Sequence, residues 1–143
     1  MEIVGVIKVI GLIGMLLICS YCDLKEKQVS VLYIAVGGMV TILMTVMEGE
    51  ISTVNMLCGI GIGLLLLLAG KVTKGAIGTG DAYIVSVLGA GIGGYEMLLV
   101  LFYALFITSI VSIILLALKR VNKKSSLPFI PFLLVGYVGV FFL

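Results

Sequence analysis

Six apolar stretches, each separated from the next by a short polar or turn-forming break, restrict this chain to one kind of fold. They cover residues 3–22, 29–47, 51–70, 82–94, 97–118 and 127–143. A helix needs about 20 apolar residues to cross a hydrocarbon layer roughly 30 Å thick, and all but the fourth stretch approach that length. Because 62% of the residues are hydrophobic and only 11% are charged, a water-soluble globule is excluded. The sequence predicts an all-α membrane protein, a bundle of six transmembrane helices forming one membrane-embedded domain over residues 1–143.

The fourth stretch is unusually short. A helix over residues 82–94 would extend only about 20 Å. Joining it to the fifth stretch does not help, because a single helix over 82–118 would be about 55 Å long and would bury Glu96 near its middle. We therefore expect a short fourth helix that is separate from the fifth.

Basic residues gather in the first, third and fifth breaks. They are Lys25, Lys27, Lys71, Lys74, Lys119, Arg120, Lys123 and Lys124. With six helices these breaks share one side, which the positive-inside rule assigns to the cytoplasm, so that both termini lie outside a cell membrane. Lys8 is the one basic residue elsewhere. Since the basic residues lie in short breaks, we expect the lipid bilayer, and no nucleic acid, as a partner.

Glycine pairs occur at four-residue spacing in two of the stretches. Gly59 and Gly63 lie in the third, and Gly89 and Gly93 in the fourth. Such spacings allow helix backbones to approach closely, so we interpret them as packing sites.

Cofactor chemistry has little support in the composition. The chain has three cysteines and no histidine, which supports neither a zinc site nor a disulfide framework. Cys19 and Cys22 form a C-x-x-C pair, but without a βαβ unit we expect them to pack at a helix end. We predict no metal and no cofactor.

Asp23 and Asp81 are the only aspartates in the chain. The predicted topology puts Asp23 where the first helix reaches the cytoplasmic face and Asp81 where the fourth helix leaves that face. Because the fourth helix is short, Asp81 would lie recessed in the membrane, where an ionisable group costs about 2.5 to 3.5 kcal/mol and usually marks function. The glycine-rich segment 74–80 before it leaves backbone groups free to pair with an extended peptide.

Structural roles are open for both residues. Aspartate is a preferred N-cap, so Asp81 could simply cap the fourth helix. Asp23 could simply end the first helix in a solvated turn.

If the two carboxyl groups approach each other, they would share a proton, as in an aspartic-protease dyad. One carboxylate would activate a water molecule while the protonated partner polarises the peptide carbonyl. A helix N-terminus favours negative charge, so we hypothesise Asp81 as the base and Asp23 as the acid.

Three motifs in order resemble those of the type IV prepilin peptidases, which are GxGD-type intramembrane aspartic peptidases. Gly78-Thr-Gly-Asp81 matches the GxGD signature, and Asp23 stands where the family's first catalytic aspartate ends a helix. Leu127-Pro-Phe-Ile-Pro-Phe132, with Gly136 after it, resembles the family's P-F-x-P-F segment. The resemblance implies that Asp23 and Asp81 are catalytic.

By the same resemblance, four residues of these motifs are expected to position the substrate. They are Gly78, Gly80, Pro128 and Pro131. Two positions depart from the family pattern. Val29-Ser30-Val31 stands where Ile-Pro-Asn is frequent, and Tyr83 where a lysine is usual, so substrate positioning is affected while the acids are retained. The first break is also too short for the family's methyltransferase insert, which implies a peptidase without S-adenosylmethionine use.

The resemblance implies removal of a short basic leader from a prepilin or pilin-like precursor at the cytoplasmic face. A rival interpretation is a small ion- or proton-coupled transporter that uses the two aspartates as a relay. Its difficulty is that both acids lie on one side, whereas a relay needs acids through the depth of the membrane. A third interpretation is a catalytically silent assembly component with the same fold.

Overall fold

A computed structural model of the chain describes residues 2–26, 30–75, 78–119 and 129–142. In these ranges it forms six α-helices and contains no strand. The helices are α1 (Glu2–Glu26), α2 (Val31–Glu48), α3 (Thr53–Val72), α4 (Thr79–Ile92), α5 (Gly94–Ala117) and α6 (Ile130–Phe142). The predicted all-α membrane fold is confirmed.

Four of the helices, α1, α2, α3 and α5, are long and apolar enough to cross a membrane. The other two are shorter, with 14 residues in α4 and 13 in α6. At 1.5 Å per residue they extend only about 20 Å each. The chain is therefore a multi-pass membrane protein in which two short helices are held among longer ones.

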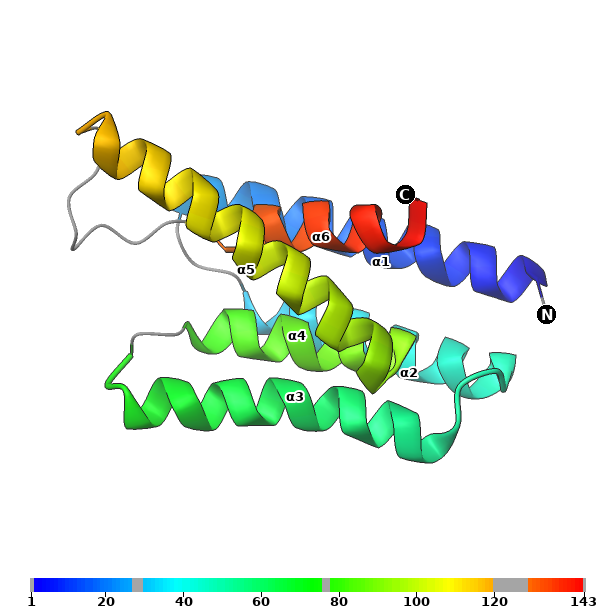
Figure 1. The fold of residues 1–143 in the computed structure, drawn as a ribbon. Coiled ribbons are helices and arrows are strands. Elements are labelled where there is room, and N and C mark those ends of the chain that lie inside the picture. The colour runs from blue at the N-terminus through cyan, green and yellow to red at the C-terminus, as the bar shows by residue number, and fades with distance from the viewer. Residues whose placement is uncertain (1, 27–29, 76–77, 120–128, 143) are drawn as a thin grey trace.

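Successive helices run in opposite directions, so α1, α3 and α5 end at the same end of the bundle, where α2, α4 and α6 begin (Figure 1). We call this the basic end, because the last turns of the long helices and the residues after them carry Lys25, Lys71, Lys74 and Lys119. Both chain termini lie at the opposite end (Figure 1). Which side of the membrane the basic end faces stays a prediction.

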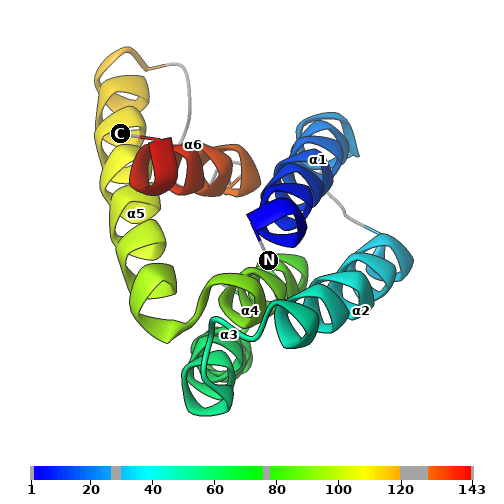
Figure 2. The same cartoon turned by 90° about the vertical axis from the view of Figure 1, so that its right-hand side faces the viewer.

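The short helix α4 occupies the middle of the bundle. It packs against α2, α3 and α5, and Figure 2 shows it enclosed by its neighbours. Ile84, Val85 and Leu88 on this helix have no solvent-exposed area. A helix too short to cross the hydrocarbon is thus surrounded by protein, which removes the need to match the membrane thickness.

Glycines bring α3 and α4 close together, as the four-residue spacings predict. Gly59 on α3 faces Gly89 on α4, and Gly63 faces Ser86, with no room for a Cβ atom at any of the three glycines. Gly93 has a different role. Its φ of 92° lies in the region that favours glycine, and it ends α4.

The chain breaks between α4 and α5 at this glycine. The amide nitrogen of Gly94 donates a hydrogen bond to Oδ1 of Asn55, at 2.9 Å. Asn55 belongs to α3, so its side chain holds the start of α5 against a neighbouring helix. Glu96 consequently lies in the first turn of α5 and not in the middle of a long helix. The predicted separation of the fourth and fifth helices is confirmed.

Candidate active site

Asp81 lies in the first turn of α4, where it is half-buried. The helix begins three residues earlier than the apolar pattern indicates, and its N-cap is Gly78, with extended backbone angles of −65° and 137° and no side-chain cap bond. The Ala82 amide donates to the Gly78 carbonyl oxygen at 3.3 Å. Asp81 is thus not the N-cap residue, and that interpretation of its presence is wrong.

Asp23 lies on α1, one turn before this helix ends at Glu26. The helix continues three residues beyond the position where the sequence suggested that Asp23 ends it. The backbone amide of Ile130, the first residue of α6, lies near the Asp23 carboxyl group. Its Oδ2 atom is buried and has no hydrogen-bond partner among the described residues. Asp23 is therefore half-buried in the last turn of α1, with one carboxyl oxygen shielded from solvent, and does not lie in a solvated turn.

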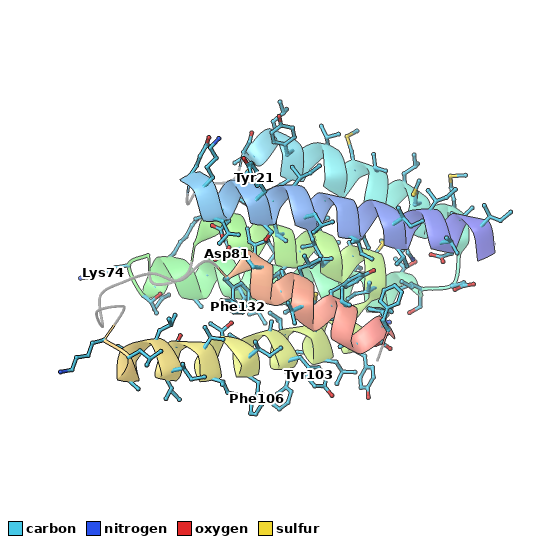
Figure 3. All side chains as sticks on the ribbon, turned by 90° about the horizontal axis from the view of Figure 1, so that it is seen from above. Tyr21, Lys74, Asp81, Tyr103, Phe106 and Phe132 are labelled. Carbon is cyan, nitrogen blue, oxygen red and sulfur yellow. The ribbon has the colours of Figure 1, made fainter. Side chains whose placement is uncertain are left out.

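The two aspartates lie at the same end of the bundle, the basic end. Asp23 is close enough for its charge to act on the Asp81 carboxyl group. No hydrogen bond joins the two side chains within the ranges that the structure describes. In Figure 3 the labelled Asp81 lies between Tyr21, on α1, and Phe132, on α6. Three helices thus border one site: α1 and α4 with a carboxyl group each, and α6 with its first turn.

Three of the residues expected to position a substrate are described, and they lie at the starts of α4 and α6. Gly78 is exposed, and a Cβ atom built on it would lie 3.2 Å from Oδ2 of Asp81. Gly80 precedes Asp81 in the first turn of α4, half-buried. Pro131 follows Ile130 in the first turn of α6, where a missing amide hydrogen costs no helical hydrogen bond. Pro128 lies outside the described residues.

The positions that depart from the family pattern are at the helix starts. Ser30 is the N-cap of α2, and Tyr83 is 39% exposed on α4, two residues after Asp81. Val29 lies outside the described residues. Of the C-x-x-C pair, Cys19 packs in the hydrophobic core and Cys22 is half-buried, both as free thiols.

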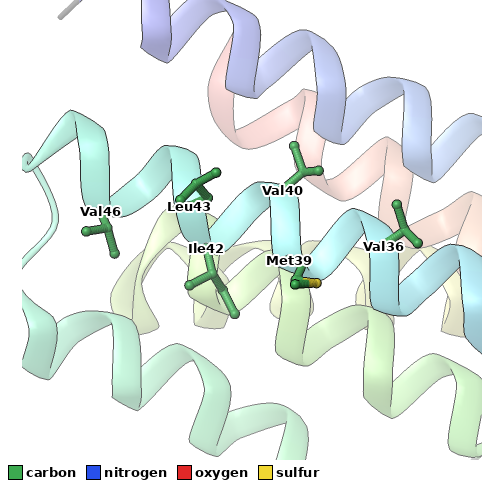
Figure 4. A pocket seen from close by; sticks show the side chains of 6 residues that line it. All are labelled: Val36, Met39, Val40, Ile42, Leu43 and Val46. Carbon is green, nitrogen blue, oxygen red and sulfur yellow. The ribbon is translucent and has the colours of Figure 1, made fainter.

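Two concave regions of the surface lie away from the aspartates. One is formed by apolar residues of α2 alone, among them Val36, Val40 and Leu43 (Figure 4). The other lies near the chain termini and includes Glu48, Glu50 and Phe141. Neither is lined by Asp23 or Asp81, so these regions do not belong to the candidate active site.

Sequence patterns did not indicate the Ile130 amide or the side chain of Asn55. The amide has no side-chain signature, and only the LPFIPF segment pointed to the start of α6. Asn55 could have been noticed as the one amide side chain within the third apolar stretch, opposite the glycine pair at 93 and 94. Its partner, however, is 39 residues away.

The family model of the type IV leader peptidase family matches residues 10–113. The match includes both aspartates and covers more than half of the chain. The chain belongs to the type IV leader peptidase family. The predicted family is thereby confirmed, and with it a peptidase embedded in a membrane, while the LPFIPF segment lies beyond the matched residues. Among curated proteins and among solved structures, no match to this type IV leader peptidase was found.

Proposed function

We propose that the chain is an intramembrane aspartic endopeptidase that uses Asp23 and Asp81 to remove the leader of prepilin or pilin-like precursors. The observation that carries the proposal is that Asp23 and Asp81, from helices far apart in the sequence, lie at the same end of the bundle and near each other. Family membership supports the peptidase class. The aspartic mechanism rests on the geometry of the site.

Two carboxyl groups at close range share one proton, because both cannot be ionised cheaply. The ionised group takes a proton from a water molecule as the water oxygen attacks the carbonyl carbon of the leader junction. The protonated group polarises the carbonyl oxygen and then gives a proton to the leaving nitrogen. The products are a leader with a free carboxyl group and a mature chain with a free amine.

The base and acid roles depend on which carboxyl group is ionised. The first turn of α4 favours charge on Asp81 through the helix dipole. A backbone amide as near to Asp23 as that of Ile130 would favour charge on Asp23 as well. These two influences oppose each other, so the assignment of Asp81 as base and Asp23 as acid stays a prediction, and the two carboxyl groups titrate as one unit.

Substrate binding would use the exposed backbone before α4 and the start of α6. Gly78 has an extended conformation and no side chain, so a peptide can approach its backbone groups. The apolar stem of a precursor would remain in the bilayer and present the leader junction near the basic end. The lysines there support a cytoplasmic placement of the site.

The test is co-expression of the chain with a pilin-like precursor, followed by mass spectrometry of the precursor's N-terminus. Asp23→Asn and Asp81→Asn should each reduce leader removal by about 100- to 10,000-fold, the usual contribution of acid–base groups. Glu26→Gln is the matched control, because Glu26 is an exposed acid three residues after Asp23 on the same helix. Leader removal at the wild-type rate in either aspartate variant would refute the dyad.

A further inference from the structure

Hydrophobicity does not determine which face of α1 points into the protein. Ile3, Ile10, Leu17 and Leu24 lie on one stripe of this helix and are between 54% and 75% exposed, facing the lipid. The buried stripe on the other side contains leucines as well. Because lipid chains are as apolar as leucine, burial of either stripe gives a similar free energy. The rotation of α1 about its own axis needs another determinant.

Lys8 lies on the buried stripe of α1. Lys8, Leu12 and Leu16 follow one another at four-residue spacing, and Cys19 and Asp23 continue the same stripe toward the basic end. Fifteen residues separate Lys8 from Asp23, which at 3.6 residues per turn puts the two side chains within about 60° of each other around the helix. A rotation that moves Lys8 out of the interior therefore turns Asp23 away from Asp81.

The partner of Lys8 is Glu48, the last residue of α2. Their side chains form a salt bridge and are only 9% and 6% exposed. Gly5 makes room for this contact, because a Cβ atom on it would lie 2.7 Å from Oε1 of Glu48. A rotation of α1 would separate the charges and leave both unpaired in an apolar environment. Unlike the apolar contacts, the pair is satisfied in one orientation only.

We propose that Lys8 and Glu48 are a positioning pair, which sets the rotation of α1 and thereby turns Asp23 toward Asp81 from the opposite end of the helix. Their effect on catalysis rests on the proposed function of the two aspartates. The orientation itself can be measured without activity, because Cys19 lies on the same stripe and is 1% exposed.

The experiment uses the full chain in membranes, with Cys22→Ser and Cys58→Ser so that Cys19 is the only thiol. In this background Lys8 and Glu48 are both replaced by methionine, which removes the charges without leaving one of them unpaired. The reaction of Cys19 with a membrane-permeant maleimide is expected to become at least about tenfold faster, since exposure of a buried group follows its local opening. Leader removal is expected to fall about 10- to 100-fold, as for other small misplacements of catalytic groups.

Two further variants separate rotation from loss of packing. The exchange Lys8→Glu with Glu48→Lys restores opposite charges and should restore both the protection of Cys19 and leader removal. Val100→Cys, combined with Cys19→Ser, places the only thiol at a fully buried position of α5. This thiol should stay protected when the pair is replaced by methionines.

Each contrary result has a definite meaning. If Cys19 stays unreactive in the methionine variant, the positioning role is refuted. It is also refuted if Cys19 becomes reactive while the rate of leader removal is unchanged. Reaction at position 100 would show that the pair stabilises the whole bundle, which also rejects a specific effect on rotation. A failure of the proposed function can be told apart from these results. It would appear as leader removal at the wild-type rate in Asp23→Asn, whatever the reactivity of Cys19.

Discussion

Gly59 on α3 and Gly89 on α4 lie backbone against backbone. A Cβ atom on either residue would collide with the carbonyl group of the other. Backbone atoms cannot move aside as side chains can, so this contact determines how closely α4 approaches α3. The same α4 carries Asp81 in its first turn, so this glycine pair also determines where that carboxyl group lies.

Replacement of Gly59 or Gly89 by alanine should therefore destabilise the protein. A backbone carbonyl cannot rotate away as a side chain can, and overpacking of this kind costs about 1 to 3 kcal/mol. We expect a lower melting temperature in detergent and a lower rate of leader removal. Gly61→Ala is the matched control, because Gly61 is also on α3 and a Cβ atom added to it would have no neighbour within 4 Å. A wild-type melting temperature for Gly59→Ala would contradict the contact.

Loss of the hydrogen bond between Asn55 and Gly94 should also destabilise the protein. Asn55→Ala removes the acceptor of the Gly94 amide and leaves a buried donor unpaired, at a cost of about 1 to 3 kcal/mol. Unfolding of the purified protein by heat or denaturant measures this cost. Asn55→Asp keeps an oxygen at the position of Oδ1 and should retain most of the stability. Equal loss in both variants would show that the hydrogen bond is not the cause.

A third close contact holds the middle of α6 against α5. A Cβ atom on Gly136 would lie 2.8 Å from the Val100 carbonyl oxygen and 3.1 Å from the Ala104 nitrogen, both on α5. Gly136→Ala should push α6 away from α5 and with it the Ile130 amide, which lies near Asp23. We expect slower leader removal, by about 10- to 100-fold. Gly139→Ala, with nothing within 4 Å, should leave the rate unchanged, and equal effects of the two variants would contradict this role.

The number of helices and the isolation of α4 could be predicted because both depend on local pattern. Apolar length gives the spans, and the break follows from the excessive length of a joined helix with Glu96 near its middle. The meeting of Asp23 and Asp81 at one end also follows from counting helices. These features need no knowledge of which residues touch.

Helix ends and long-range partners could not be predicted in the same way. The charged residues after Asp23 suggested a turn, yet they extend α1 to Glu26, because residues with good helix propensity can stay helical in a solvated segment. Glycine has a low helix propensity, so Gly80 was expected outside the helix. Contacts of α4 with its neighbours outweigh this low propensity. The pairing of Lys8 with Glu48 depends on three-dimensional proximity, for which a single sequence carries no signal.

Removal of the Tyr137 hydroxyl is expected to stabilise the protein. The side chain of Tyr137 has no exposed area, and its hydroxyl oxygen has no hydrogen-bond partner among the described residues. Burial of an unpaired hydroxyl costs about 1 to 3 kcal/mol, so Tyr137→Phe should raise the melting temperature. Tyr103→Phe, at a position 48% exposed, should not change it. A lower melting temperature for Tyr137→Phe would show that the hydroxyl is hydrogen-bonded.

Gly78 allows the position of the Asp81 carboxyl group to be tested with little effect on the fold. The backbone angles of Gly78 are accessible to alanine, and an N-cap glycine contributes less than about 1 kcal/mol relative to alanine. A Cβ atom, however, would lie 3.2 Å from Oδ2 of Asp81, so the carboxyl group must shift by a few tenths of an ångström. Since misplacement by about 1 Å can cost 100-fold in rate, Gly78→Ala should slow leader removal by about tenfold while the melting temperature changes little. Gly14→Ala, which has nothing within 4 Å, should change neither quantity. Leader removal at the wild-type rate in Gly78→Ala would mean that the Asp81 carboxyl group acts from a different position.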